Sequence, residues 1–110
     1  MSRRLLSPVE LADQLSVLPG WSVAEGGTAI CRAFRFDRYM DGIAFVNRLA
    51  ALAESRDHHP DLSVGWCRVT VQWSTHDIGG VSGWDVECAA QTDRPTDRLT
   101  DQLVDQLGDG

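Results

Sequence analysis

Positive charge is scarce in this sequence of 110 residues: 10 basic side chains face 16 acidic ones, and the formal net charge is -6 at pH 7. Binding to a phosphate backbone depends on clustered lysine and arginine side chains, so nucleic acid is not an expected partner. The hydrophobic share of 43% and the charged share of 24% are ordinary for a soluble globular protein, which excludes a wholly disordered chain.

Cysteines and long apolar runs are also few. The 3 cysteines, Cys31, Cys67 and Cys88, include no CxxC pair and no metal-finger spacing, which indicates reduced thiols and a cytoplasmic location. After the start MSRRLLSPVE, acidic and polar residues come before an apolar signal core or a membrane span is complete, so we expect no membrane partner. No GxGxxG or Walker-type loop is present, and Gly79-Gly80 is typical of a tight turn.

No linker, long repeat or low-complexity segment divides the chain. Residues 1–110 are therefore predicted to form a single domain. A domain of this size has a small core, and assembly with identical copies would bury further surface. We expect a homodimer or a homotetramer.

The N-terminal third of the chain predicts a short helix followed by a hairpin. Residues 7–10, SPVE, combine a capping box with a proline at the first helical position, and Pro19-Gly20 ends the helix. Residues 21–23 and 29–36 predict two paired strands around a glycine turn. Arg32 falls on the apolar face of the second strand, where a charge is out of place.

A long helix is predicted from Tyr39 to about Asp57, before Pro60 forces the preceding residue out of helical geometry. Residues 62–66 and 68–75 predict a second pair of strands. The apolar stripe of the helix consists of Met40, Ile43, Val46, Leu49, Ala50 and Ala53.

The C-terminal region predicts a helix that Ser82 and Asp85 cap and that runs through 86–90. Pro95 interrupts it, so either a second short helix or a kinked continuation follows. The apolar stripe of that last part is Leu99, Leu103, Val104 and Leu107.

All 3 histidines lie in one segment, with His58 and His59 before Pro60 and His76 after the second strand of the second pair. A hairpin could bring the rings to one cleft. Because histidine titrates near neutral pH, with an unperturbed pKa of about 6.5, such a cluster could both give and take a proton. The alternative is that each ring is a turn or surface residue held by a backbone hydrogen bond.

Two other kinds of site are weighed for the same segment. A zinc site with three imidazole ligands is disfavoured, because adjacent side chains diverge from an extended backbone and no helical HxxxH pair is present. A cysteine nucleophile is disfavoured because Cys67 and Cys88 lie at apolar positions, where thiols are usually small hydrophobic side chains.

Acidic and aromatic side chains accompany the histidines. Trp21 and Trp66 could stack on a flat heterocycle, Trp73 is typical of the core, and Trp84 fits either role. Four carboxylates could orient the rings or favour the imidazolium, with solvated surface charge as the alternative: Glu54, Asp57, Asp61 and Asp77.

A series of ordered motifs extends over about residues 6–93: LPGW at 18–21, RxFxF at 32–36, ExxxHHP at 54–60, an aromatic residue at 66, THD at 75–77, GG at 79–80 and SxxD at 82–85. The combination resembles the pterin-4a-carbinolamine dehydratase family. This resemblance implies an α+β domain in which a four-stranded antiparallel sheet carries three helices on one face. It also implies a core over about 6–93, a variable helical tail at 94–110, and an oligomer.

The resemblance implies an activity as well. The family removes water from 4a-hydroxytetrahydropterin to give quinonoid dihydropterin, a step in tetrahydrobiopterin recycling, and needs no metal or organic cofactor. A hydroxyl on C4a must leave with a proton while N5 gives one up, so an acid and a base are required. One of His59 and His76 is expected to protonate the leaving hydroxyl, while His58 favours pterin binding.

The resemblance also implies which residues form the site. By this resemblance the catalytic residues are His58, His59 and His76, the pterin-binding residues are Asp57, Pro60, Ser74, Thr75, Asp77 and Trp21, and the supporting residues are Glu54 and Asp85.

Three residues depart from the family pattern: Leu62 replaces a frequent aromatic residue, Trp84 replaces a frequent basic residue, and Pro95 breaks what is usually one helix. A basic side chain at 84 could orient the pterin, so its replacement bears on substrate affinity. The alternative function is a non-catalytic binding or assembly-factor module, because relatives act as a transcription-factor dimerisation partner or as a chaperone for a carbon-fixing enzyme. A metal-dependent hydrolase is a weaker rival.

Overall fold

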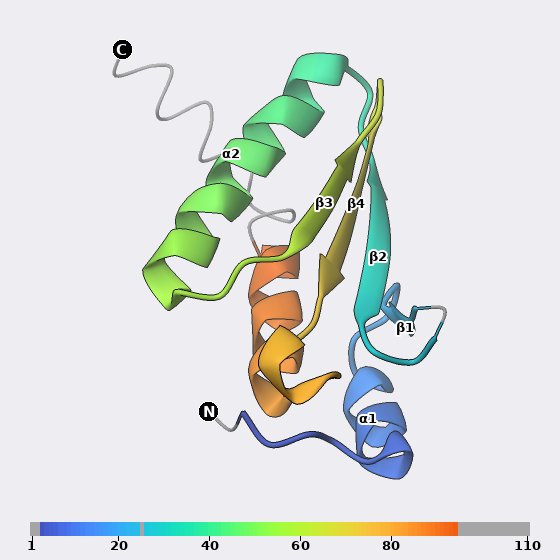
Figure 1. The fold of residues 1–110 in the computed structure, drawn as a ribbon. Helices are drawn as coiled ribbons and strands as arrows, with labels where there is room; N and C mark the ends of the chain where they lie inside the picture. Colours follow the sequence, from blue (N-terminus) through green and yellow to red (C-terminus); the bar gives the residue numbers. More distant parts are fainter. Residues whose placement is uncertain (1–2, 25, 95–110) are drawn as a thin grey trace.

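The computed structural model describes residues 3–24 and 26–94. Its four strands form one antiparallel sheet in the order β1-β2-β4-β3, and the described residues contain three α-helices (Figure 1). The predicted α+β class is therefore confirmed. The elements in chain order are α1 (Pro8–Leu15), β1 (Ser22–Val23), β2 (Ile30–Arg35), α2 (Tyr39–Arg56), β3 (Asp61–Val64), β4 (Arg68–Trp73), the 3-10 helix η1 (His76–Ile78) and a helix over 83–94.

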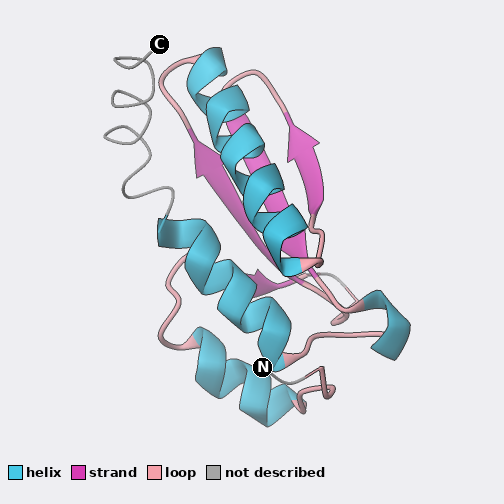
Figure 2. Cartoon of the chain, turned by 90° about the vertical axis from the view of Figure 1, so that its left-hand side faces the viewer, coloured by secondary structure: helices cyan, strands magenta, loops and turns pink. Residues whose placement is uncertain are grey.

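The helices are arranged around one side and one end of the sheet. The longest helix, α2, runs along the strands, and the helix over 83–94 lies on the same side of the sheet (Figures 1 and 2). The short helix α1 lies at the end of the sheet where β1 is found (Figure 1).

The capping box at the start of α1 is present as predicted. The Ser7 side chain accepts a hydrogen bond from the backbone N–H of Glu10, whose carboxylate accepts one from the backbone N–H of Ser7. The Arg4 side chain, and then the Ser7 backbone, lower the pKa of the Glu10 carboxyl to about 2. Arg4 thus forms an ion pair with Glu10 at the start of the helix, with 2.8 Å between Nη2 of Arg4 and Oε2 of Glu10.

The core lies between α2 and the inner faces of β2 and β4, and here the predicted helix stripe was partly wrong. Met40 is 65% exposed, whereas Phe45, which the stripe omitted, is fully buried. The inner face of α2 begins at Gly42, where an added Cβ would lie 3.3 Å from the Phe36 ring. Because the sheet approaches α2 this closely at the glycine, the buried face follows Gly42 in steps of three and four, as Gly42, Phe45, Leu49 and Ala53.

Arg32 lies on the inner face of β2, as the sequence indicated, and its charge is neutralised there. Its Nη1 lies 2.7 Å from Oδ1 of Asp93 in the helix over 83–94, and its guanidinium lies over the Phe34 ring at 4.6 Å. Trp21 donates its indole N–H to the same Asp93 carboxylate at 3.0 Å. An ion pair therefore joins the sheet to the C-terminal helix at the edge of the core.

Two predictions about the C-terminal part have different outcomes. The helix predicted after Ser82 is confirmed over 83–94. Nearly all of the predicted tail, with Pro95 and the stripe Leu99, Leu103, Val104 and Leu107, lies outside the described residues. Within the part of the chain that the structure describes, no helix combines the length and the apolar character that crossing a membrane requires.

Candidate active site

The backbone turn after α2 decides where the first two histidines point. Asp57 ends the helix in the left-handed conformation, with φ of 50° and ψ of 40°. The backbone N–H of His58 then donates back to the carbonyl of Ala53 at 3.1 Å. As a result the His58 side chain is buried and only 8% exposed, while the adjacent His59 side chain remains on the surface.

His58 is held by a hydrogen bond at its edge and by stacking contacts with two indoles. Its Nε2 lies 2.5 Å from Oδ1 of Asp85, and because a carboxylate can only accept, this nitrogen carries the hydrogen. The ring stacks on Trp84 with centroids 4.3 Å apart and on Trp73 with centroids 5.5 Å apart. The orientation of the imidazole is therefore fixed by one carboxylate and two indoles.

Asp85 is fully buried and collects hydrogen bonds from three parts of the chain. Besides His58, it accepts from the Thr75 hydroxyl at 2.7 Å and from the backbone N–H of Ser82 at 2.9 Å. Buried charge is tolerated only where such donors compensate for lost water. This carboxylate thus ties the end of α2, the end of β4 and the start of the C-terminal helix to one point.

The other two histidines are open to solvent and have carboxylate neighbours. Nε2 of His59 lies 2.6 Å from Oε1 of Glu54, one turn back on α2. Nε2 of His76, at the start of η1, lies 3.9 Å from Oδ2 of Asp61 at the start of β3. The imidazole side chains are 55% and 73% exposed, so both can exchange protons with solvent or a bound molecule.

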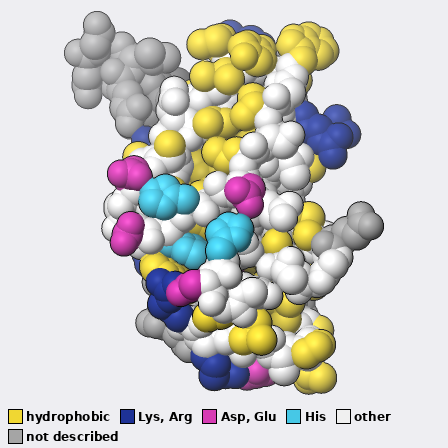
Figure 3. Space-filling view, in the orientation of Figure 1, with side chains coloured by type: hydrophobic (Ala, Val, Ile, Leu, Met, Phe, Trp, Pro, Cys, Tyr) yellow, Lys and Arg dark blue, Asp and Glu magenta, His cyan; other side chains and the backbone are white. Residues whose placement is uncertain are grey.

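All three histidines line one cavity of about 300 Å³. Figure 3 shows them gathered on one face of the molecule, with acidic side chains around them. Four other residues with predicted site roles line the same cavity: Asp57, Ser74, Thr75 and Asp77. The structure thus brings together groups from the end of α2 and from the segment that follows β4.

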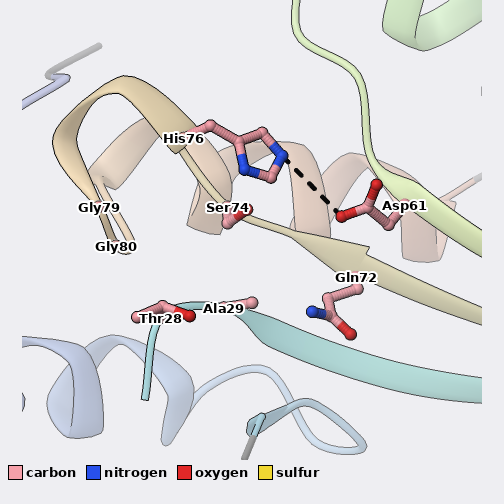
Figure 4. A pocket seen from close by; sticks show the side chains of 8 residues that line it. All are labelled: Thr28, Ala29, Asp61, Gln72, Ser74, His76, Gly79 and Gly80. Carbon is pink, nitrogen blue, oxygen red and sulfur yellow. Dashed lines mark ion pairs between the residues drawn. The ribbon is translucent and has the colours of Figure 1, made fainter. Parts of the chain in front are cut away.

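A second cavity, of about 240 Å³, adjoins the first because Ser74 and His76 line both. Figure 4 shows its other walls, with the His76 ring directed toward Asp61 across the cavity and with Gln72 and Thr28 on the opposite side. Polar side chains and apolar surface both line this second cavity.

Some predicted site residues lie elsewhere. Trp21 is 6% exposed in the core and lines neither of the two cavities, and Pro60 lines neither as well. Trp66 is 81% exposed in the turn between β3 and β4, at the opposite end of β4 from His76. A role for Trp21 or Trp66 in stacking on a ligand therefore has no support from its position.

Sequence reasoning missed Arg3, which lines the histidine cavity. Its only signal in the sequence is its charge, because it is separated by more than fifty residues from the histidine segment. Trp84, for which two roles stood open, is the indole on which His58 stacks.

Two other kinds of site were considered from the sequence, a zinc site and a cysteine nucleophile, and the structure bears on both. Among residues 3–24 and 26–94, no group of three or more histidine, cysteine, aspartate or glutamate side chains is placed to hold a metal ion. Cys88 is fully buried, and burial raises the pKa of its thiol to about 12. At neutral pH Cys88 is therefore a thiol rather than a nucleophilic thiolate.

The fold and the cavity define a small α+β protein with a cluster of histidines at the end of its sheet. Residues 4–95 match the family model described as Pterin 4 alpha carbinolamine dehydratase. A protein of Xanthomonas oryzae pv. oryzae, by name a candidate pterin-4-alpha-carbinolamine dehydratase, is 52% identical over 89 residues, which cover 81% of this chain and 75% of that protein. This chain belongs to the pterin-4a-carbinolamine dehydratase family.

Solved structures agree with this assignment. A transcriptional coactivator/pterin dehydratase from Brucella melitensis superposes with a TM-score of 0.79 at 32% identity, covering 83% of this chain and 97% of that one. A pterin dehydratase-like protein described as a RuBisCO assembly factor in the alpha-carboxysome superposes with a TM-score of 0.59 at 24% identity, covering 68% and 87%. The second likeness is one of fold alone.

Proposed function

We propose that this chain removes water from 4a-hydroxytetrahydropterin to give quinonoid dihydropterin, using its histidines as general acid and base. The observation that carries this proposal is the single cavity that two exposed imidazoles, His59 and His76, line together with the buried His58. A family of dehydratases and a cluster of titratable rings point to the same kind of chemistry.

The proposed reaction consists of two proton transfers and one bond cleavage. The C–O bond at C4a breaks, and the hydroxyl takes a proton from an imidazolium and leaves as water. N5 loses its proton to a base, and its electron pair forms the new double bond between N5 and C4a. Nothing is oxidised or reduced overall, so the proposal requires neither a metal nor an organic cofactor.

The environments of the rings support a division of roles. His59 and His76 are exposed at the cavity, so one is assigned as the acid that protonates the hydroxyl and the other as the base. His58 has one nitrogen committed to Asp85 and its ring stacked against two indoles, which suits a fixed hydrogen-bonding group that binds the pterin. Asp57, Ser74, Thr75 and Asp77 complete the proposed pterin pocket.

A dehydration assay on freshly generated 4a-hydroxytetrahydropterin tests the proposal. We expect the purified chain to form quinonoid dihydropterin well above the uncatalysed rate, with saturation in substrate. Free histidine at three times the protein concentration is the control, because it supplies the same imidazoles without a pocket. A rate equal to this control, from a chain shown by circular dichroism to be folded, would instead favour the non-catalytic binding or assembly-factor module.

We also propose that the chain works in the cytoplasm as a homodimer or homotetramer. Strand β3 is at the edge of the sheet, and edge strands present backbone groups that can pair with an identical strand. Apolar side chains are exposed on it and next to it, with Leu62 at 36%, Val64 at 45% and Trp66 at 81%. Hydrophobic side chains also gather at that end of the molecule in Figure 3.

Light scattering after size exclusion tests the proposed edge. Val64→Glu should shift the wild-type oligomer toward a smaller species, because it places a charge in an apolar strand contact. Val17→Glu is the matched control, since Val17 is 76% exposed and far from β3 along the chain. A monomeric wild type, or an equal shift in both variants, would be evidence against an interface at β3.

A further inference from the structure

The segment before α1 is attached to the chain next to the histidine cavity. The backbone N–H of Leu6 donates to the carbonyl of Val81 at 2.8 Å, and Leu5 forms a bridge with Ser82. Leu6 itself is 8% exposed, so its side chain belongs to the core. Because Ser82 also donates to Asp85, these contacts fix the segment beside the hydrogen-bond network that orients His58.

The Arg3 side chain is held in two directions at the cavity. Its Nη2 lies 2.6 Å from each carboxylate oxygen of Asp77, and its guanidinium carbon lies 4.8 Å from the centre of a Trp84 ring. Trp84 in turn stacks on His58. The Trp84 indole therefore contacts both the Arg3 guanidinium and the His58 ring, two of the groups that line the cavity.

Arg3 supplies a fixed positive charge to this cavity. An arginine stays protonated at every physiological pH. The bonds to Asp77 come from Nη2, and a guanidinium carries N–H groups on two further nitrogens. With a side chain 51% exposed and already ordered by Asp77 and Trp84, little further entropy is lost when those groups bind a ligand.

We propose that Arg3 is a substrate-binding residue, which donates hydrogen bonds to acceptor atoms on the edge of the pterin. A pyrimidinone ring presents a carbonyl oxygen and ring nitrogens in one plane, and the planar fork of a guanidinium matches such an edge. The proposal rests on the proposed function for the identity of the ligand. It assigns to the N-terminal segment a part of the site that lies outside the histidine segment.

Steady-state kinetics with Arg3→Gln provide the test. We expect KM for 4a-hydroxytetrahydropterin to rise at least about tenfold while kcat stays within about twofold, because hydrogen bonds from a charged donor contribute that much to binding. Arg3→Lys should fall between, since it keeps the charge and loses the fork. Arg4→Gln is the matched control, because Arg4 pairs with Glu10 at the start of α1 and does not line the cavity.

Binding of 7,8-dihydropterin, which has no hydroxyl to lose, separates this inference from the proposed reaction. Calorimetry should show Kd raised at least about tenfold by Arg3→Gln and within about twofold by Arg4→Gln. If the wild type binds this pterin but does not dehydrate the substrate, only the proposed function fails.

Three results would overturn the role of Arg3. Equal losses of affinity in both arginine variants would mean that total charge, not position, matters. A lower kcat with unchanged KM would mean that Arg3 acts through Trp84 and His58 rather than on the substrate. A wild type that binds no pterin would remove both the proposed function and this inference.

Discussion

Replacing His59 or His76 with alanine should slow the dehydration of 4a-hydroxytetrahydropterin at least about tenfold in each variant. Positioned acids and bases typically contribute about 10²–10⁴-fold, and tenfold is a conservative lower bound because water can take over part of the role. Single-turnover rates measured at saturating substrate report this loss directly, since both variants retain His58 and its network with Asp85.

Added imidazole provides the control for this prediction. If the lost group acts on protons, free imidazole should restore part of the rate in each alanine variant, and it should leave the wild type unaffected. Asp61→Asn is a matched surface change. It removes the carboxylate whose Oδ2 lies 3.9 Å from Nε2 of His76, and it keeps the imidazole ring of His76. Unchanged rates in both His59→Ala and His76→Ala would overturn the assignment of the acid and the base.

Local sequence signals predicted the local structure well. The capping box of Ser7 and Glu10 does start α1, and the strand predicted over 68–75 is present as β4, with Val69, Val71 and Trp73 buried on one face. Such features depend on neighbours within a few residues, so the sequence contains their whole cause. The motif HHP also marked the end of α2, although the turn itself is made by the left-handed Asp57.

Features that depend on distant contacts were predicted poorly. The predicted apolar stripe of α2 differs from the buried one because Gly42 allows the helix to approach Phe36 closely. Residue spacing within the helix does not reveal a neighbour that lies outside the helix. Arg3 and Trp84 were missed or left open for the same reason. Their roles come from a segment attached by backbone bonds at Val81 and Ser82, which no motif records.

Trp84 shows how sequence and structure are combined. In the sequence, Trp84 replaces a basic residue that is frequent at this position in the family, and this replacement was expected to affect the affinity for substrate. In the structure Arg3 lies over the Trp84 ring and reaches Asp77. Arg3, which lines the histidine cavity, thus brings a basic group from the N-terminal segment next to residue 84.

Asp85 is the residue whose replacement should destabilise the fold most. Asp85→Ala removes the acceptor of His58, of the Thr75 hydroxyl and of the Ser82 backbone N–H, and it leaves these buried donors without that partner. Breaking one partner of a buried charged network costs about 3–5 kcal/mol. We expect the free energy of unfolding to fall by about that amount.

Urea unfolding followed by tryptophan fluorescence measures this change, and two variants sharpen it. Asp85→Asn keeps the shape of the side chain but turns one acceptor into a donor, so it should lose about 1–3 kcal/mol. Asp41→Asn is the matched control, because Asp41 makes a surface pair with Arg38 at 3.3 Å, and such pairs contribute at most about 1 kcal/mol. If Asp85→Asn unfolds at the same urea concentration as the wild type, the carboxylate does not hold the three segments together, and the fixed orientation of His58 must come from the stacked indoles alone.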